Sequence, residues 1–568
     1  MTVNDAGPLS FYPTHRVLNQ PPPRVDVNEF SENTPLVEYL HTIGEIETPN
    51  ADDGSDAGTA GGSNAEATRA LEATGAVVGS AQFQDDARLA HKNPPILRTH
   101  SKYGLRIDEV EYHPSYHRII SQAVAAGAHT SAWASPGKGA SALRAAQFML
   151  FAQVEPGHAC PISMSHAAVE SIALAPDVAE EWLPRLYSRQ YAPELSVNKP
   201  GALFGMAMTE KQGGSDVRAN TTRAVSAGEH HLLTGHKWFC SAPMSDAFLM
   251  LAQDDAGLGC FLVPRVLPDG TRNTFLLQRL KDKAGNRSNA SAEVEFANTV
   301  GWRIGDPGRG VRAIMGMVGR TRLDCVLGTA AGMRQSVAEA VWHARHRHAF
   351  GAHLIDQPAM TNVLADLALE SEAATAVGLR LARAFDNDAG ATELAFRRLA
   401  TAVTKYWVCK RGPNHAYEAM ECLGGNGYIE DFPLAMRYRE QPVMAIWEGT
   451  GNVIGLDVLR AMSTEPESVE AFFDELRLAA GAHPVFDDFA ARLKEELAPM
   501  RAVPQEFAGQ ARNVVEKLAL ALQASLLLRF APAEVSDAFV VSRLGADRSF
   551  NYGTLPNSSD LAGILARA

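Results

Sequence analysis

The segment from Met206 to Asp216, MAMTEKQGGSD, places a dense run of polar and small residues directly after the apolar stretch GALFGM. Gly213 and Gly214 can adopt backbone angles that are closed to other residues, and successive N–H groups of such a loop can form an anion-binding nest. The hydroxyl groups of Thr209 and Ser215 add donors beside it. The pattern favours a loop that binds a ligand with a polar ring edge and a phosphate. An ordinary solvated loop between domains is the alternative.

A second group of candidate residues lies in QPVMAIWEGTGNVIGLDVLR, Gln441 to Arg460. Glu448 follows the apolar run VMAIW and precedes a glycine-rich turn at the start of a predicted helix. A carboxylate that is partly removed from water has a raised pKa and can act as a general base near neutral pH. The turn and Asn452 offer contacts to another part of the ligand. The alternative role of Glu448 is to cap the helix that follows.

Two further motifs contain residues that could bind a ligand. In GHKWFCSAP, Trp238 lies on a predicted strand, where a flat indole could lie against a flat cofactor; packing in a core is the alternative. In HARHRHAFG, the spacing of His343, His346 and His348 makes a metal site conceivable. Because these three side chains do not share one helix face well, we expect a polar helix surface instead and no metal.

Composition narrows the function class. The 568 residues carry a net charge of −13, with 46% hydrophobic and 21% charged residues, which is typical of a soluble globular protein and does not favour nucleic acid or an anionic membrane surface. Six scattered cysteines without a CxxC pair suggest free thiols in a reducing compartment. No secretory signal is expected at the start, and the most apolar helical run, Leu518 to Leu528, is too short to cross a bilayer. We expect a cytoplasmic protein.

The elements that must position these residues change in type along the chain. Runs such as YHRIISQAVAAGAHTSAW have helical spacing, short β-prone runs separated by turns follow, and long helical runs return after Gly319. The sequence therefore predicts an α+β protein with a β domain between helical domains. We expect an N-terminal arm (1–44), a flexible low-complexity insertion (45–88), an N-terminal helical domain (89–204), a β domain (205–316), a helical bundle (317–462) and a further helical tail (463–568).

Several long motifs occur in one order within this frame. They are MTEKQGGSDVRANTTRA, GHKWF, RLKDKAGNRSNASAEVEF, RHAFG, CKRG, LGGNGY and IWEGTGN, preceded by NQPPP, NPPILR and CPISM. With them the sequence resembles the acyl-CoA dehydrogenase family, and within it the AidB-like branch of alkylation-response flavoproteins. The resemblance covers about residues 14–462 apart from the insertion near 49–80, and it continues more weakly into the tail.

The resemblance implies an N-terminal all-α domain, a central β-barrel, a C-terminal four-helix bundle and an extra C-terminal helical region. It also implies FAD and a homotetramer. The residues that it implies for FAD binding are Met206, Met208, Thr209, Gly213, Gly214, Ser215, Trp238, Phe239, Cys240, Ser241, Gly449, Thr450, Gly451 and Asn452, while Arg347, Gly424 and Gly425 would reach the FAD of a neighbouring subunit.

The family chemistry removes an α-proton of an acyl-CoA with a carboxylate while the β-hydrogen leaves as hydride to the flavin. Glu448 matches the usual position of the base. In some members of the family the base occupies another position. The matching position in this sequence is near Thr321, whose side chain cannot act as a base. Arg322, in GRTRLD, matches an arginine on the substrate side and could pair with Glu448 or Asp324. The resemblance thus implies an FAD-dependent oxidoreductase acting on a CH–CH bond of an acyl-CoA or a related acyl substrate.

Departures from the common family pattern concern the flavin loop and strand. Cys240, a weak donor, occupies the position of a threonine that touches the flavin. Lys211 to Gly214 replace Pro-Gly-Ala-Gly, and Pro358 replaces a glutamine. The AidB-like branch shares these changes, so we expect flavin binding with weak turnover.

The branch also suggests an alternative function, a flavin-containing DNA-binding protein that protects against alkylation damage. Arg460 and the tail would then face duplex DNA, with Arg543 and Arg548 as possible members of a basic patch. From Arg460 onward, however, eleven Lys and Arg residues stand against fifteen Asp and Glu residues, a net charge of −4. Duplex binding depends on neutralising phosphates, so this charge argues for the enzyme.

Overall fold

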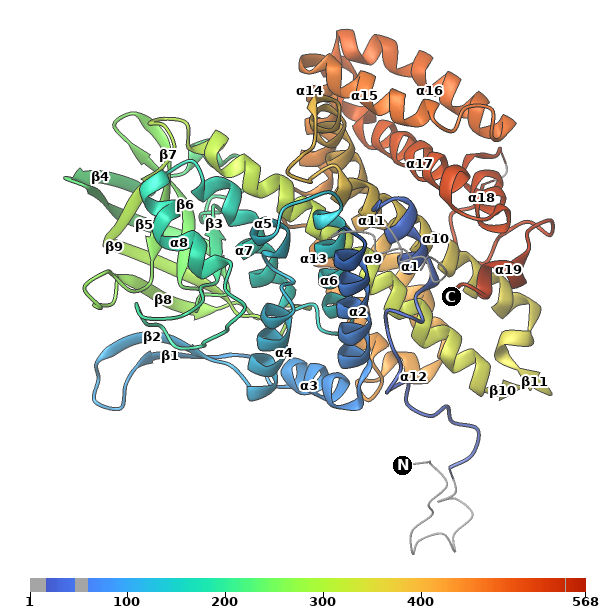
Figure 1. Cartoon of the computed structure of the whole chain (residues 1–568), viewed down its shortest axis with the longest axis horizontal. Helices are drawn as coiled ribbons and strands as arrows, with labels where there is room; N and C mark the ends of the chain where they lie inside the picture. The colour runs from blue at the N-terminus through green and yellow to red at the C-terminus, as the bar shows by residue number, and fades with distance from the viewer. Residues whose placement is uncertain (1–16, 46–59, 547) are drawn as a thin grey trace, which may run out of the picture.

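The computed structural model describes residues 17–45, 60–546 and 548–568. In the described residues a β domain lies at one end of the molecule, a helical bundle occupies the middle, and the tail helices cover the bundle (Figure 1). The N-terminal elements, which fill the space between the β domain and the bundle, are α1 (Thr34–Thr42), α2 (Ala60–Gly79), α3 (Ala81–Lys92), β1 (Ile96–His100), β2 (Arg106–Glu111), α4 (Pro114–Ala125), α5 (Ser131–Ala134), α6 (Ala140–Val154), α7 (Ala159–Ile172) and α8 (Pro176–Leu186).

Seven strands in the middle of the chain form one sheet whose pairing closes on itself. β6 pairs with β4 and β7, β7 pairs with β9, β9 with β5, and β5 with β4, while β3 lies beside β6 and β8 beside β9. The closed path confirms the predicted β-barrel. Its strands are β3 (Phe204–Ala207), β4 (Arg223–Ala227), β5 (His230–Ser241), β6 (Ala247–Asp254), β7 (Gly257–Pro264), β8 (Phe275–Leu280) and β9 (Ser291–Ile304).

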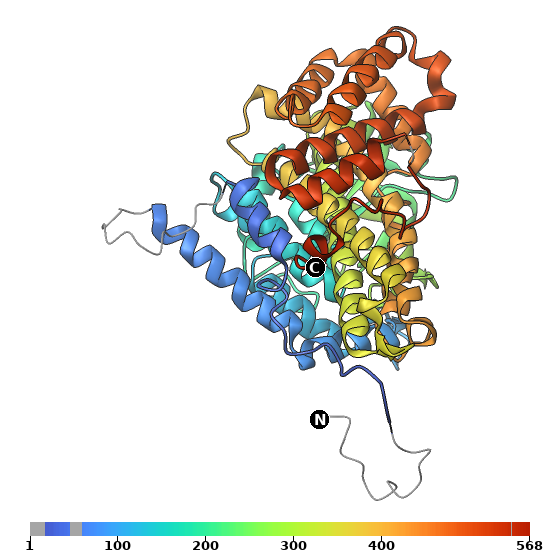
Figure 2. The same ribbon diagram turned by 90° about the vertical axis from the view of Figure 1, so that its right-hand side faces the viewer.

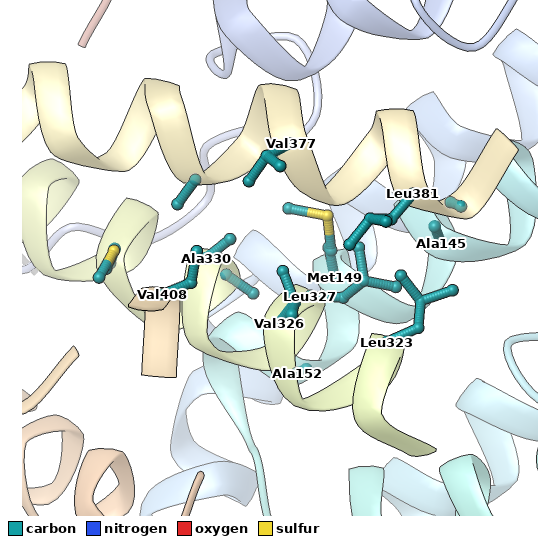
Figure 3. Close-up of a cluster of buried hydrophobic side chains, with 14 of the residues drawn as sticks. Ala145, Met149, Ala152, Leu323, Val326, Leu327, Ala330, Val377, Leu381 and Val408 are labelled. Carbon is teal, nitrogen blue, oxygen red and sulfur yellow. The ribbon is translucent and has the colours of Figure 1, made fainter. Parts of the chain in front are cut away.

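The bundle is built around α9, which is buried along most of its 37 residues. α9 packs against α6 and α7 of the N-terminal region and against α10, α11 and α13 of the bundle. Figure 3 shows Leu327 of α9 in one apolar cluster with Met149 of α6 and Val377 of α10. The bundle elements are α9 (Gly310–His346), β10 (His348–Ala349), β11 (Ala352–His353), α10 (Pro358–Arg383), α11 (Ala391–Cys422), α12 (Gly425–Tyr428), α13 (Leu434–Met444) and α14 (Gly451–Thr464).

The tail is a set of helices on the outside of the bundle (Figure 2). α15 and α17 pack against α11, and α17 also packs against α10 and α14. Phe472 of α15 is fully buried and stacks with Phe396 of α11 at a ring distance of 6.3 Å. The tail helices are α15 (Pro466–Arg477), α16 (Pro484–Ala502), α17 (Ala511–Phe530), α18 (Ala533–Phe539) and α19 (Leu561–Leu565). No helix in the described ranges is both long and apolar enough to span a membrane.

The structure corrects the predicted flexible insertion over 45–88. From residue 60 onward this prediction is wrong, because α2 and α3 occupy the segment; residues 46–59 lie outside the described residues. The small residues that suggested flexibility instead allow close packing. Leu71 is buried in the main hydrophobic cluster, and a Cβ at Gly75 would lie 2.1 Å from Asn28 Oδ1.

Two smaller corrections concern the rest of the N-terminal region. The predicted arm contains a buried helix, α1, in which Tyr39 and Leu40 are almost completely buried. The predicted all-helical stretch after residue 89 contains the β1–β2 hairpin, which packs against β8. Arg106–Glu111 contains two apolar residues, Ile107 and Val110, which stand three positions apart and so give no strand periodicity.

We expect Leu327→Ala to lower the stability of the helical core. Leu327 is fully buried between helices, so truncation leaves a cavity that costs about 2–5 kcal/mol. The measurement is the midpoint of thermal or urea unfolding. Val225→Ala, at a valine that is 64% exposed, is the matched control and should change the midpoint little. An equal effect of the two changes would contradict the packing.

Candidate active site

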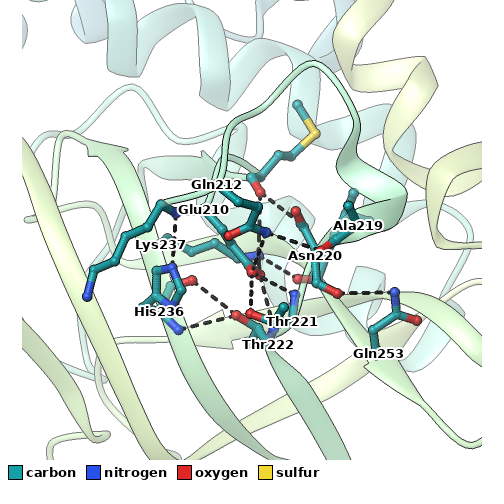
Figure 4. Close-up of polar contacts among 12 residues, drawn as sticks. Glu210, Gln212, Ala219, Asn220, Thr221, Thr222, His236, Lys237 and Gln253 are labelled. Carbon is teal, nitrogen blue, oxygen red and sulfur yellow. Dashed lines mark hydrogen bonds and ion pairs between the residues drawn. The ribbon is translucent and has the colours of Figure 1, made fainter.

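The glycine-rich loop after β3 is held by a buried ion pair that the sequence analysis did not identify. Lys237 Nζ of β5 lies 2.9 Å from Glu210 Oε1, and both side chains are completely buried. Glu210 also accepts hydrogen bonds from Gln212 Nε2 and from the main-chain N–H groups of Thr221 and Thr222 (Figure 4). Burial alone would raise the pKa of Glu210, but these donors and the Lys237 charge hold it well below its usual range.

This anchored turn leaves the predicted anion-binding residues facing outward. Gly213 has φ +128°, and a Cβ at Gly214 would lie 2.3 Å from Thr209 Oγ1. The backbone of Gly213, Gly214 and Ser215 is therefore exposed on the outer side of the loop, while Met206 is buried at the end of β3. Trp238 N–H donates to Thr209 O at 2.8 Å and joins the loop to β5.

The side chains of β5 differ in what they can contact. Phe239 is 50% exposed, Trp238 is partly buried with Lys281 Nζ 3.2 Å from its ring centre, and Ser241 Oγ lies 3.1 Å from Ser291 Oγ. Cys240 is fully buried in the barrel core, and burial raises the pKa of its thiol to about 12. The thiol of Cys240 is thus closed off from the surface. The main chain of Cys240 is therefore the part that could contact a ligand, and its place in the flavin site stays a prediction.

Glu448 lies between α13 and α14 in a strained backbone conformation. Its φ of +56° falls in the left-handed region, which is uncommon for a residue with a side chain and is often found at functional sites. Its carboxylate Oε2 accepts a hydrogen bond from Thr321 Oγ1 of α9 at 2.8 Å. No other donor in the described residues reaches this carboxylate, and the first helical N–H groups of α14 do not. Glu448 is therefore not a helix cap, which removes that alternative.

Burial raises the pKa of Glu448 above its ordinary value, while the Thr321 hydrogen bond and the charges of Arg322 and Lys405 oppose the shift. Arg322 does not reach the carboxylate: its Nε donates to the main-chain oxygen of Glu448 at 2.9 Å, and its Nη1 lies 3.2 Å from Asp457. The expected pairing of Arg322 with Asp324 is wrong, because Asp324 is buried with another guanidinium, that of Arg144.

A buried lysine fixes the turn that carries Glu448. Lys405 Nζ of α11 donates to Trp447 O at 2.8 Å and to Gly449 O at 2.7 Å, so it holds the main chain on both sides of Glu448. Gly449 has φ +109°. Thr450 is the N-cap of α14, and Asn452 Oδ1 accepts a hydrogen bond from Arg512 of the tail at 2.8 Å. The turn is thus tied both to the bundle and to the tail.

Cys160, at the start of α7, connects the β5 end of the site with Glu448. Burial raises the pKa of the Cys160 thiol to about 11; the charge of Lys283 lowers it, the charge of Glu448 raises it, and a hydrogen bond with Ser241 lowers it. Ser241 and Glu448 therefore both lie close enough to the Cys160 thiol to affect its pKa. Trp447 packs against the hydrophobic cluster that contains Met206, so the glycine-rich loop belongs to the same region.

Three predicted residues lie at the opposite end of the bundle. Arg347 follows α9, and Gly424 and Gly425 begin α12, far from α14 (Figure 1). They meet the N-terminal arm instead: Arg347 Nη1 donates to Asn19 O at 2.6 Å, and Asn426 Nδ2 donates to Gln20 Oε1 at 2.9 Å. Within one chain these residues do not contribute to the site around Glu448.

The arginines of the alternative DNA-binding function are paired with carboxylates. Arg460 lies 2.6 Å from Asp457, Arg548 lies 3.3 Å from Glu516, and Arg543 is paired with Asp366 of the bundle. The Asp457 carboxylate is shared with Arg322 and Arg398, so among the three arginines it is Arg460 whose charge is least compensated. In the described part of the chain, no group of three or more His, Cys, Asp or Glu residues could hold a metal ion.

The sequence did not reveal several residues that hold the predicted site residues in place. These are the Glu210–Lys237 pair, Lys405, Asp457 and Cys160. A possible signal for the first was a lone lysine inside the β-prone run HKWFC together with a glutamate in the preceding loop, because a buried charge requires a partner. For the others only the packing of distant helices reveals the contact.

We expect Glu210→Ala to destabilise the loop more than Lys237→Met. The alanine variant leaves the Lys237 ammonium and two main-chain donors unpaired, which costs about 3–5 kcal/mol. In Lys237→Met, Glu210 keeps its hydrogen bonds to the loop. Thermal unfolding and protease cleavage within 206–216 measure the difference. The control is Lys211→Met, which removes an exposed pair to Glu295 worth about 1 kcal/mol or less; a loss as large as that in Glu210→Ala would contradict this account.

Three family profiles match consecutive parts of the chain. The adaptive response protein AidB N-terminal domain matches residues 19–193, the acyl-CoA dehydrogenase middle domain 205–299, and the acyl-CoA dehydrogenase C-terminal domain 308–463. The "Putative acyl-CoA dehydrogenase AidB" of Escherichia coli K12 is 42% identical over 93% of this chain and 94% of its own length. Acyl-CoA dehydrogenase family member 11 of Caenorhabditis elegans is 31% identical over 59% of this chain and 57% of its own.

Solved structures share the fold. ACDH-11 of Caenorhabditis elegans, in complex with C11-CoA, superposes with a TM-score of 0.82 at 24% identity over 92% of this chain and 91% of its own. An acyl-CoA dehydrogenase of Bacillus anthracis complexed with FAD gives 0.66 at 15% identity, with 92% of each chain covered. With the helix–barrel–helix order and the relative at 42% identity, these observations lead to one conclusion: the chain belongs to the acyl-CoA dehydrogenase family, in its AidB branch.

Proposed function

We propose that the chain is an FAD-dependent oxidoreductase that forms an α,β-double bond in an acyl-CoA or a related acyl substrate, with Glu448 as the base. The observation that carries this proposal is the state of the Glu448 carboxyl group. Burial raises its pKa, Thr321 holds one oxygen, and no described residue donates to the other oxygen. A carboxylate in this state can accept a proton near neutral pH.

The residues around Glu448 fit FAD. The exposed turn at Gly213–Ser215 offers main-chain N–H groups to a pyrophosphate. Phe239 provides an exposed aromatic surface for a flat ring, and the indole N–H of Trp447 is buried without a partner among the described residues. Bound FAD would accept the hydride that leaves the substrate. The FAD complexes among the family's solved structures support the same cofactor.

The chain's own residues would perform the proton step. Glu448 Oε1 is open to a substrate, while the hydrogen bond to Oε2 and the Lys405 contacts orient the carboxyl group. Cys325 and Met444 are buried beside Trp447 and exclude water from this side of the site. A dry environment strengthens each electrostatic contact with the reacting atoms. Arg322, which holds the Glu448 main chain, acts through the position of the base rather than on the carboxylate.

We also propose that the active form is a homotetramer. Arg347, Gly424 and Gly425 lie away from Glu448 in the same chain, as expected if they contact the FAD of a neighbouring subunit. The six free, buried cysteines support a reducing location such as the cytoplasm. Duplex DNA remains the weaker alternative partner, because Arg460, Arg543 and Arg548 are each paired with an acid.

We expect Glu448→Gln to abolish reduction of the flavin by acyl-CoA. The amide keeps the shape of the side chain but cannot accept the proton, so the rate should fall by about 10²- to 10⁴-fold. The measurement is anaerobic bleaching of the yellow protein with a panel of acyl-CoAs. FAD should stay bound in the variant. Bleaching at the wild-type rate would contradict the assignment of Glu448.

We expect Thr321→Val to move the acidic limb of the pH–rate profile to higher pH. The hydrogen bond from Thr321 stabilises the charged form of Glu448 and so lowers its pKa. Without it the pKa rises further, and the base is lost at a higher pH as the solution is acidified. The profile of kcat/KM against pH measures the shift. Thr329→Val, at a threonine of α9 that bonds Cys325 O, is the matched control.

A further inference from the structure

Lys283, in the loop between β8 and β9, lies beside the β5 end of the site. Its Nζ donates to Asn289 O at 2.6 Å and to Ser291 Oγ at 3.1 Å. Ser291 Oγ is in turn 3.1 Å from Ser241 Oγ. A short chain of polar atoms thus joins the Lys283 ammonium to Ser241, the last residue of β5.

The positive charge of Lys283 lacks an ion pair. In the described residues no carboxylate lies within ion-pair distance of its Nζ, whereas neighbouring Lys281 is 2.5 Å from Glu293 and Lys237 is 2.9 Å from Glu210. The carboxylate that influences the pKa of Lys283 is that of Glu440, which forms no ion pair with it. Burial lowers the pKa of Lys283 to about 8, so the ammonium form still predominates at neutral pH.

Lys283 and Glu448 both influence one buried group, the Cys160 thiol. The charge of each affects the pKa of the Cys160 thiol, Lys283 lowering it and Glu448 raising it. The ammonium of Lys283 is thus within electrostatic range of Cys160, as the carboxylate of Glu448 is, and it is linked to Ser241 through Ser291. A partly buried cation whose charge is not neutralised by an ion pair is costly, which suggests that a negative charge arrives there during function.

We propose that Lys283 is a positioning residue whose ammonium group balances the negative charge that hydride transfer brings into this region, and this inference rests on the proposed function. In the proposed reaction the acyl group would lose a proton from Cα to Glu448 and a hydride from Cβ, which FAD held here would accept, and a Cα=Cβ double bond would form. The two electrons and one negative charge enter with the hydride. The Lys283 ammonium, linked through Ser291 to Ser241, stabilises that charge and raises the reduction potential of bound FAD.

The test is the two-electron reduction potential of bound FAD, measured by equilibration with a reference dye at saturating FAD. Lys283→Met removes the charge and the hydrogen bonds, Lys283→Gln keeps an N–H donor without the charge, and Lys283→Arg keeps the charge. We expect at least a tenfold loss of stabilisation of the reduced state in the Met and Gln variants, a potential about 30 mV more negative. The Arg variant should stay near the wild type.

Arg272→Gln, in the same β domain as Lys283, is the control, because it removes an exposed positive charge that is paired with Glu109 of the N-terminal region. An unchanged potential in Lys283→Met or Lys283→Gln would overturn the inference. If both variants fail to fold while Lys283→Arg folds, Lys283 has a structural role and the inference is also overturned. A wild-type protein that does not bind FAD would contradict the proposed function itself, which distinguishes the two failures.

Discussion

Burial of α9 on several sides is the constraint on which the rest of the molecule depends. One 37-residue helix packs against α6 and α7 of the N-terminal region, against α10, α11 and α13 of the bundle, and against β7 of the barrel. The same helix supplies Thr321 to the Glu448 carboxylate and Arg322 to its main chain. The position of the base is therefore fixed by the packing of the whole core, because interiors at close-packed density allow little local adjustment.

Most charged side chains in this core form ion pairs or hydrogen bonds with neighbouring groups. The Glu210–Lys237 and Arg144–Asp324 pairs are fully buried and are surrounded by additional hydrogen bonds, which makes them tolerable in an apolar interior. Glu448 and Lys283 differ, since each keeps an ionisable group without a direct ion pair. Ionisable groups that carry such a cost are typical of functional sites. Buried guanidinium groups held only by main-chain oxygens also occur at Arg265 and Arg437, so incomplete charge pairing accompanies the site but is not confined to it.

Much of the architecture could be predicted from the sequence because the helical and β-prone patterns extend over long segments. Helical runs of more than twenty residues and a block of short β-prone runs identified the bundle and the barrel, and the motif around Glu448 indicated a base at an apolar edge. The segment from residue 60 was misjudged because its small residues lack a strong apolar stripe, yet α2 is stabilised by close contact, as at Gly75. The composition of one segment does not indicate that its backbone packs closely against a segment far away in the chain.

The sequence by itself determined the family, the order of the domains and the candidate base, because these depend on residue types and spacing within single segments. Only the tertiary structure decided which groups surround that base. Thr321, Lys405 and Cys160 come from three different helices, and Lys283 comes from a loop of the barrel. The tertiary structure also showed that the thiol of Cys240 is enclosed in the barrel core. Such contacts follow from the packing of elements far apart in the chain, and no periodicity within one segment encodes them.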